Sequence, residues 1–180
     1  TERDFFVVSG GYSWPVAGPV EESYEAGGTL AASFRTGVTG MNFLSGLEFG
    51  YTWSTLDTAK LAELNPGSTY SGGDMGLLSI TTSNDWIFGT AGKTMRPFIT
   101  GGIGYYRSFI DDATETTGST TEAYSTGVYE GSFFGFTAGI GTYIKRDRFG
   151  LRLDANYNYL FAGGPNLEAF TARGGIVFYM

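Results

Sequence analysis

Hydrophobic and polar residues alternate with a period of two along most of this chain. In residues 149–161 every odd-numbered residue is apolar or aromatic, whereas the even-numbered residues are Gly, Arg, Asp, Asn, Asn and Leu. A helix would scatter the two sets around its axis, but a strand places them on opposite faces. The pattern therefore predicts a β-strand with one bulky apolar face and one small or polar face.

Eight segments follow this rule, and the connections between them are alternately long and short. Residues 74–88 fit least well, because Met75 and Leu77 fall on the opposite face from Leu78 and Ile80. The predicted strands are residues 5–14, 29–36, 42–54, 74–88, 98–109, 133–144, 149–161 and 170–180. Together they predict an all-β fold, an eight-stranded antiparallel up-and-down barrel forming a single domain over residues 1–180. The Thr-, Ser- and Gly-rich connection at 113–126 is expected to be mobile.

The distribution of bulky residues predicts which face of the barrel points outward. A soluble barrel places its large apolar residues inside, whereas a transmembrane barrel places them outside against lipid. An eight-stranded barrel has room inside only for side chains that fill it, so about five large residues per strand do not fit there. If the bulky residues point outward instead, eight glycines face the interior: Gly46, Gly50, Gly102, Gly104, Gly135, Gly139, Gly141 and Gly175. This arrangement also puts five charged residues there, which we expect to form a structural cluster of ion pairs: Arg35, Glu48, Arg152, Asp154 and Arg173.

Aromatic residues support a transmembrane β-barrel. Most predicted strands have 10 to 13 residues, and a tilted membrane-spanning strand needs about 9–11. Outward aromatic residues near the strand ends are predicted to form an aromatic girdle: Tyr12, Trp14, Tyr51, Trp53, Trp86, Tyr105, Tyr157 and Tyr159. Inward aromatic residues at the short-turn end are predicted to plug that mouth: Phe5, Phe98, Tyr143 and Tyr179.

Three stretches of the sequence resemble the outer-membrane β-barrel family of Gram-negative bacteria, the eight-stranded OmpA/OmpX-like and opacity-type surface proteins. They are the Pro-aromatic and Gly-x-Gly-Tyr run at 96–105, the Ala-Gly-x-Gly run at 135–141 and the Arg- and Asp-bearing strand at 151–159. The resemblance covers essentially the whole chain. It differs at the C-terminus, because family members usually end in an aromatic residue, whereas this chain ends Phe178-Tyr179-Met180.

The resemblance implies a bacterial outer-membrane location, with short turns in the periplasm and long loops outside the cell. The long loops carry a formal charge of −10, the short-turn end with the N-terminus +2 and the lumen +1, which account for the net charge of −7. Outer-membrane lipid and lipopolysaccharide are the implied partners, together with envelope or surface proteins. The absence of a basic run argues against nucleic acid.

The composition argues against catalysis. The 180-residue chain has no Cys and no His, which removes thiolate metal sites, Cys nucleophiles and His-dependent triads. The enzymes among the outer-membrane β-barrels that this chain resembles rely on an essential His. The acidic residues Asp111, Asp112 and Glu115 lack the spacing of a calcium loop, so neither a metal nor a cofactor is expected.

We therefore expect a non-enzymatic barrel with a structural or surface-interaction role through long acidic loops. Two alternatives remain open from the sequence. One is a narrow pore or a subunit of a larger envelope complex. The other is a soluble, calycin-like ligand-binding barrel, which requires the opposite sidedness.

Overall fold

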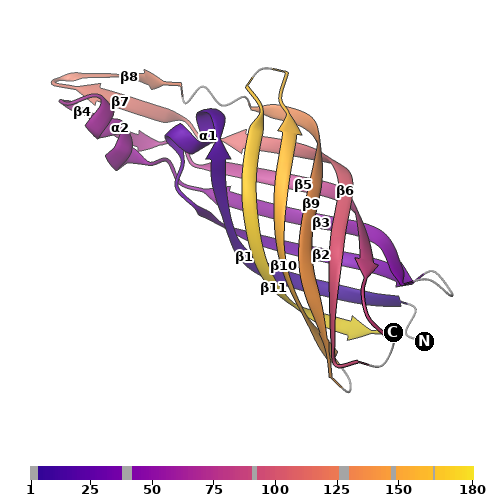
Figure 1. The fold of residues 1–180 in the computed structure, drawn as a ribbon. Coiled ribbons are helices and arrows are strands. Elements are labelled where there is room, and N and C mark those ends of the chain that lie inside the picture. The colour runs from indigo at the N-terminus through magenta and orange to yellow at the C-terminus, as the bar shows by residue number, and fades with distance from the viewer. Residues whose placement is uncertain (1–3, 38–41, 91–92, 126–129, 147–148, 164) are drawn as a thin grey trace.

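The long strands of the protein close into one antiparallel barrel. The computed structural model describes residues 4–37, 42–90, 93–125, 130–146, 149–163 and 165–180. Within these residues, eight strands pair in the order β1-β11-β10-β9-β6-β5-β3-β2 and β2 returns to β1 (Figure 1). They are β1 (Asp4–Ala17), β2 (Gly27–Gly37), β3 (Phe43–Ser54), β5 (Met75–Ile87), β6 (Met95–Ile110), β9 (Gly131–Lys145), β10 (Phe149–Phe161) and β11 (Leu167–Tyr179). The predicted fold class and all eight predicted strands are confirmed.

The bulky apolar residues lie on the outside of the barrel. The side chain of Phe49 is 53% exposed and that of Ile140 is 64% exposed, whereas Arg152 is 2% exposed. Leu151 and Phe136 also point outward. A soluble carrier barrel requires the reverse arrangement, so the calycin-like alternative is wrong.

The long connections fold into further elements, which the sequence analysis did not predict. Two short helices, α1 (Gly18–Ser23) and α2 (Thr58–Leu64), accompany a sheet of three strands in the order β4-β7-β8, which projects from one end of the barrel (Figure 1). This loop sheet consists of β4 (Ser68–Gly72), β7 (Ala113–Thr117) and β8 (Thr120–Tyr124). No described helix is long and apolar enough to cross a membrane.

The β7–β8 hairpin contradicts the expectation of a mobile loop at 113–126. A two-residue turn joins the strands, and Gly118 adopts a φ of 62° there, a left-handed conformation that glycine reaches without strain. Threonines at five of the ten strand positions of the hairpin favour extended backbone. Residue 126 lies outside the described residues.

Each end of the barrel is closed by an apolar cluster. The cluster at the short-turn end includes Phe5, Val7, Phe98 and Tyr143. The cluster at the long-loop end, here called the apolar cap, joins luminal residues of the barrel to residues of the folded loops: Val20, Tyr24, Leu56, Leu61, Tyr70, Met75, Tyr106, Ala113, Phe133, Leu160 and Leu167. Met75 and Leu77, which disturbed the alternation of their strand, face this cap.

Candidate functional site

Six charged luminal side chains form a closed ring of alternating ion pairs, the charge ring. In ring order, the members in the described part of the chain are Arg35, Asp85, Arg152, Asp154, Arg173 and Glu48. Each arginine contacts two carboxylates and each carboxylate contacts two arginines. Three positive and three negative charges therefore balance, as buried charges must.

The ion-pair distances around the ring are short. Arg152 lies 2.5 Å from Asp85 and 2.6 Å from Asp154. Arg173 lies 3.0 Å from Asp154 and 2.6 Å from Glu48. Arg35 closes the ring, at 3.2 Å from Glu48 and in direct contact with Asp85. These are charge-assisted hydrogen bonds, which are about twice as strong as neutral ones.

Small residues on neighbouring strands make room for the arginines. Arg35 is paired in register with Gly46, Arg152 with Gly175 and Arg173 with Gly11. A Cβ atom at Gly46 would lie 1.9 Å from the carbonyl oxygen of Phe34. Glycine at these positions therefore lets the strands pack closely while leaving luminal space for guanidinium groups.

Asp85, which is one of the residues counted in the predicted charge of +2 at the short-turn end, belongs to the charge ring instead. This corrects the luminal charge from +1 to zero and the charge of the short-turn end from +2 to +3. Asp85 also accepts a hydrogen bond of 2.6 Å from the Tyr143 hydroxyl. Asp85 continues a series of small polar residues at alternate positions of β5, namely Ser79, Thr81 and Ser83. This alternation is the sequence signal that identifies Asp85 as a luminal residue.

The structure brings the four predicted plug residues together at the short-turn end. The ring centroids of Phe5 and Tyr143 lie 5.7 Å apart, those of Phe98 and Tyr143 4.8 Å, and those of Phe5 and Tyr179 6.2 Å. The guanidinium of Arg152 lies 4.2 Å from the Phe98 ring centroid, so the plug and the charge ring are in contact. Four aliphatic residues that the sequence analysis missed complete the closure: Val7, Leu44, Ile87 and Val177.

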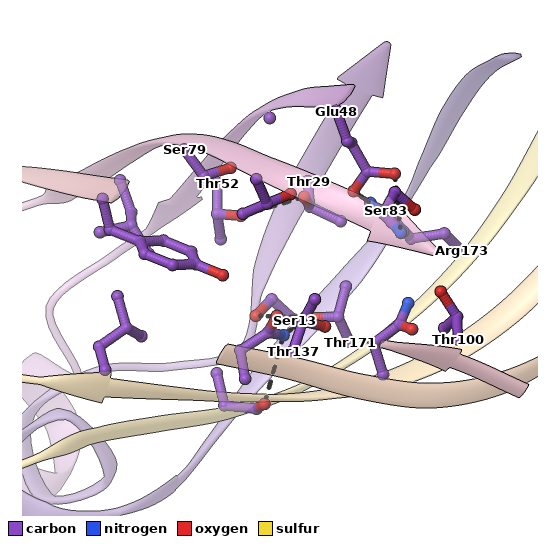
Figure 2. A pocket seen from close by; sticks show the side chains of 18 residues that line it. Ser13, Thr29, Glu48, Thr52, Ser79, Ser83, Thr100, Thr137, Thr171 and Arg173 are labelled. Atoms are coloured by element: carbon purple, nitrogen blue, oxygen red, sulfur yellow. Dashed lines mark hydrogen bonds and ion pairs between the residues drawn. The ribbon is translucent and has the colours of Figure 1, made fainter. Parts of the chain in front are cut away.

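A polar cavity of about 60 Å³ lies between the charge ring and the apolar cap. Glu48 and Arg173 line it on the ring side, and Tyr106 and Leu160 line it on the cap side. Figure 2 shows hydroxyl side chains pointing into it from several strands: Ser13, Thr29, Thr52, Ser79, Ser83, Thr100, Thr137 and Thr171. This volume holds about four water molecules.

The predicted girdle residues lie on the outer face. Those toward the long-loop end form aromatic contacts along and between strands: Tyr12 with Trp14, Tyr51 with Trp53, Tyr105 with Phe134, and Tyr159 with Phe136. The hydroxyl of Tyr157 donates a hydrogen bond to Glu168. Trp86 lies toward the other end, 5.0 Å from Phe43 between ring centroids. The outer face therefore carries aromatic residues toward both the long-loop end and the short-turn end, with aliphatic residues between them.

Known structures share this architecture. No protein-family model matches the sequence, and no curated protein matches it. Neisserial surface protein A superimposes with a TM-score of 0.62 at 12% identity, over 98% of this chain and 97% of that one. A major outer membrane protein from Thermus thermophilus superimposes with a TM-score of 0.59 at 12% identity, over the full length of both chains. The fold is that of the eight-stranded outer-membrane barrels.

The loop sheet carries the carboxylates of Glu115 and Glu122. The hydroxyl of Tyr70 donates a hydrogen bond of 2.9 Å to Glu115. Burial raises the pKa of Tyr70, and the Glu115 carboxylate raises it further, so the hydroxyl keeps its proton and remains a donor. Among the described residues no group of three or more carboxylates is arranged to hold a metal ion.

Proposed function

We propose that the protein is an integral outer-membrane β-barrel with a closed lumen, and that it acts as a non-enzymatic structural or surface-interaction protein through its acidic outer region. Its short turns face the periplasm and its long loops face the outside of the cell. The observation that carries the proposal is the combination of an apolar outer face with a lumen sealed at both ends.

The outer face supports membrane residence on physical grounds. A closed barrel satisfies every backbone hydrogen bond of its spanning strands, which is what the hydrocarbon region demands. Its aliphatic middle, including Ile103 and Ile140, is exposed. In water this surface would greatly exceed the few hundred square ångströms of contiguous apolar patch that monomeric soluble proteins tolerate. Outer-membrane lipid and lipopolysaccharide are therefore its proposed partners.

The sealed lumen favours a structural or interaction role over transport. A solute would have to displace the aromatic plug, break the charge ring and unpack the apolar cap. The cap is built from loop residues, such as Val20 and Leu61, as well as from barrel residues. Since residues of the long loops pack into the apolar cap, the loops present a defined acidic surface to envelope or surface proteins.

Site-specific labelling tests the location and the orientation. The chain has no Cys, so a Ser119→Cys variant in the β7–β8 turn and a Thr90→Cys variant in a short turn each supply one thiol. Both positions are exposed. When the variants are exported to the envelope of a Gram-negative host, a membrane-impermeant maleimide should label the Ser119→Cys variant on intact cells. It should label the Thr90→Cys variant only after the outer membrane is opened. Labelling of the Thr90→Cys variant alone on intact cells would reverse the proposed orientation.

Conductance measurements test the closed lumen. In planar bilayers the purified protein should give no stable channel at neutral pH, because the charge ring and both apolar clusters block the lumen. A porin reconstituted in the same bilayers provides the control for insertion. Reproducible single-channel openings of nanosiemens size would contradict the closed lumen and would favour the narrow-pore alternative.

A further inference from the structure

One edge of the loop sheet is open. The sheet has the order β4-β7-β8, so β4 and β8 are its two outer strands. The turn that follows α2 lies against β4, where the Ser68 amide donates to the Asn65 carbonyl at 3.1 Å and the Asn65 side chain donates to the Tyr70 hydroxyl at 3.0 Å. Among the described elements, only β7 pairs with β8. An unpaired edge strand is a template for a further strand.

The geometry of the hairpin identifies the backbone groups that line this edge. Thr117 and Thr120 are register partners on either side of the two-residue turn. In a hairpin with a two-residue turn, the residues beside the turn form a hydrogen-bonded pair, and such pairs alternate along the strands. Thr121 and Ala123 therefore direct their N–H and C=O groups away from β7, toward the open edge. Both residues are exposed.

The charges beside the edge favour a cationic partner. Glu122 on β8 lies directly opposite Glu115 on β7, and like charges at such a position destabilise a sheet. None of the ion pairs among the described residues involves a loop carboxylate. Asp111, Asp112 and Glu130 line an open hollow together with Glu122, at the base of the hairpin. Within the described part of the chain, the edge thus combines backbone groups that pair with no further strand and carboxylates that form no ion pair.

The exposed face of the loop sheet is a weaker recognition element than its edge. The face is rich in hydroxyls, but those of Ser71 and Thr114 bond to each other at 2.9 Å, as do those of Thr116 and Thr121. Their hydrogen-bonding capacity is partly used within the sheet, whereas the outward backbone groups of Thr121 and Ala123 have no partner strand in the described structure.

We propose that β8 is a docking edge that takes an extended segment of a partner protein as a fourth strand of the loop sheet, with Lys or Arg at alternate positions of that segment. Backbone hydrogen bonds to Thr121 and Ala123 supply the affinity, and alternate cationic side chains meet Glu122 and its acidic neighbours. This is strand addition to an exposed sheet edge. The inference rests on the proposed surface-interaction role and names the partner of the same outer region.

Peptide binding to the full chain in detergent micelles tests the proposal. The probe is a fluorescent peptide of about nine residues that alternates Thr and Lys, a length that covers one strand. A second peptide carries Glu in place of every Lys, and a third carries the Lys residues but has N-methylated amides on both of its hydrogen-bonding edges. Fluorescence anisotropy should show saturable binding of the first peptide only, because the second has the wrong charge and the third cannot extend the sheet.

Two variants and a matched control assign the binding to the edge. Combining Thr121→Pro with Ala123→Pro removes both outward N–H groups and should weaken binding of the Lys peptide by about tenfold or more. Proline is tolerated on edge strands, and the methylated peptide makes the same test without altering the protein. Glu122→Lys should reverse the preference toward the Glu peptide. Glu63→Lys makes the same reversal of charge at a position on α2 and should leave the preference for the Lys peptide over the Glu peptide unchanged.

The results separate this inference from the proposed membrane role. Absence of saturable Lys-peptide binding overturns the docking edge, as does equal binding by the methylated peptide or by the double proline variant. Because binding is measured in micelles, these outcomes leave the labelling result on intact cells unchanged. Conversely, peptide binding together with reversed labelling would keep the docking edge and overturn the proposed orientation.

Discussion

Replacing Asp85 with Asn should lower the free energy of unfolding of the barrel by about 3–5 kcal/mol, the cost of breaking a buried ion pair by removing one partner. Asp85 is fully buried and contacts both Arg35 and Arg152. Asn has nearly the same shape, so the change removes charge with little loss of packing. The lumen then holds three guanidinium groups and only two carboxylates.

Urea unfolding in lipid vesicles, followed by tryptophan fluorescence, measures this change. Glu63→Gln removes a carboxylate from an exposed position on α2 and should change the free energy by no more than about 0.5 kcal/mol. Adding Arg35→Met to Asp85→Asn restores charge balance and should recover part of the loss. A cost below about 1 kcal/mol for Asp85→Asn would mean that the charge ring does not stabilise the barrel.

Replacing Ile140 with Arg should destabilise the barrel in lipid by about 2–4 kcal/mol, because an arginine on the lipid face near the bilayer midplane is costly. Ile140 lies near the middle of β9 and points outward. If the same surface faced water, an added charge at so exposed a position would cost little. The variant therefore tests the sidedness on which the proposed membrane role depends.

The matched control is Met95→Arg, at the first residue of β6, where the side chain is also exposed and outward. Near the membrane interface an arginine should cost about 0–1 kcal/mol. Both variants are unfolded in the same vesicles, and their assembly is followed by heat-dependent migration on gels. Equal costs at the two positions would contradict a lipid-facing belt centred on Ile140.

The charge ring offers a physical explanation for the composition of the lumen. A barrel this narrow cannot hold a full set of large apolar side chains. Three arginines reach across the interior from β2, β10 and β11, and three carboxylates from β3, β5 and β10 bind them. The luminal glycines that face the arginines leave the space for these contacts. Few but long charged side chains thus replace a conventional apolar core in the middle of the barrel.

The alternation of residue types determined the eight strands and their two faces, and the limited room inside an eight-stranded barrel determined that the bulky face points outward. Side-chain direction in a strand depends only on the parity of the position, so residues 149–161 specify both faces without knowledge of any neighbour. The same parity directed Arg35, Glu48, Arg152, Asp154 and Arg173 inward, and aromatic residues near the strand ends marked the girdle and one plug.

Only the tertiary structure decided how these side chains meet. Ring closure through Asp85 depends on the register of β5 against β3 and β6, which places residues from distant strands at one height in the lumen. The apolar cap and the loop sheet likewise depend on contacts between loops far apart in the sequence, such as the pairing of β4 with β7. Local alternation records the direction of a side chain, whereas its partners are set by strand register and barrel closure, which no single segment encodes.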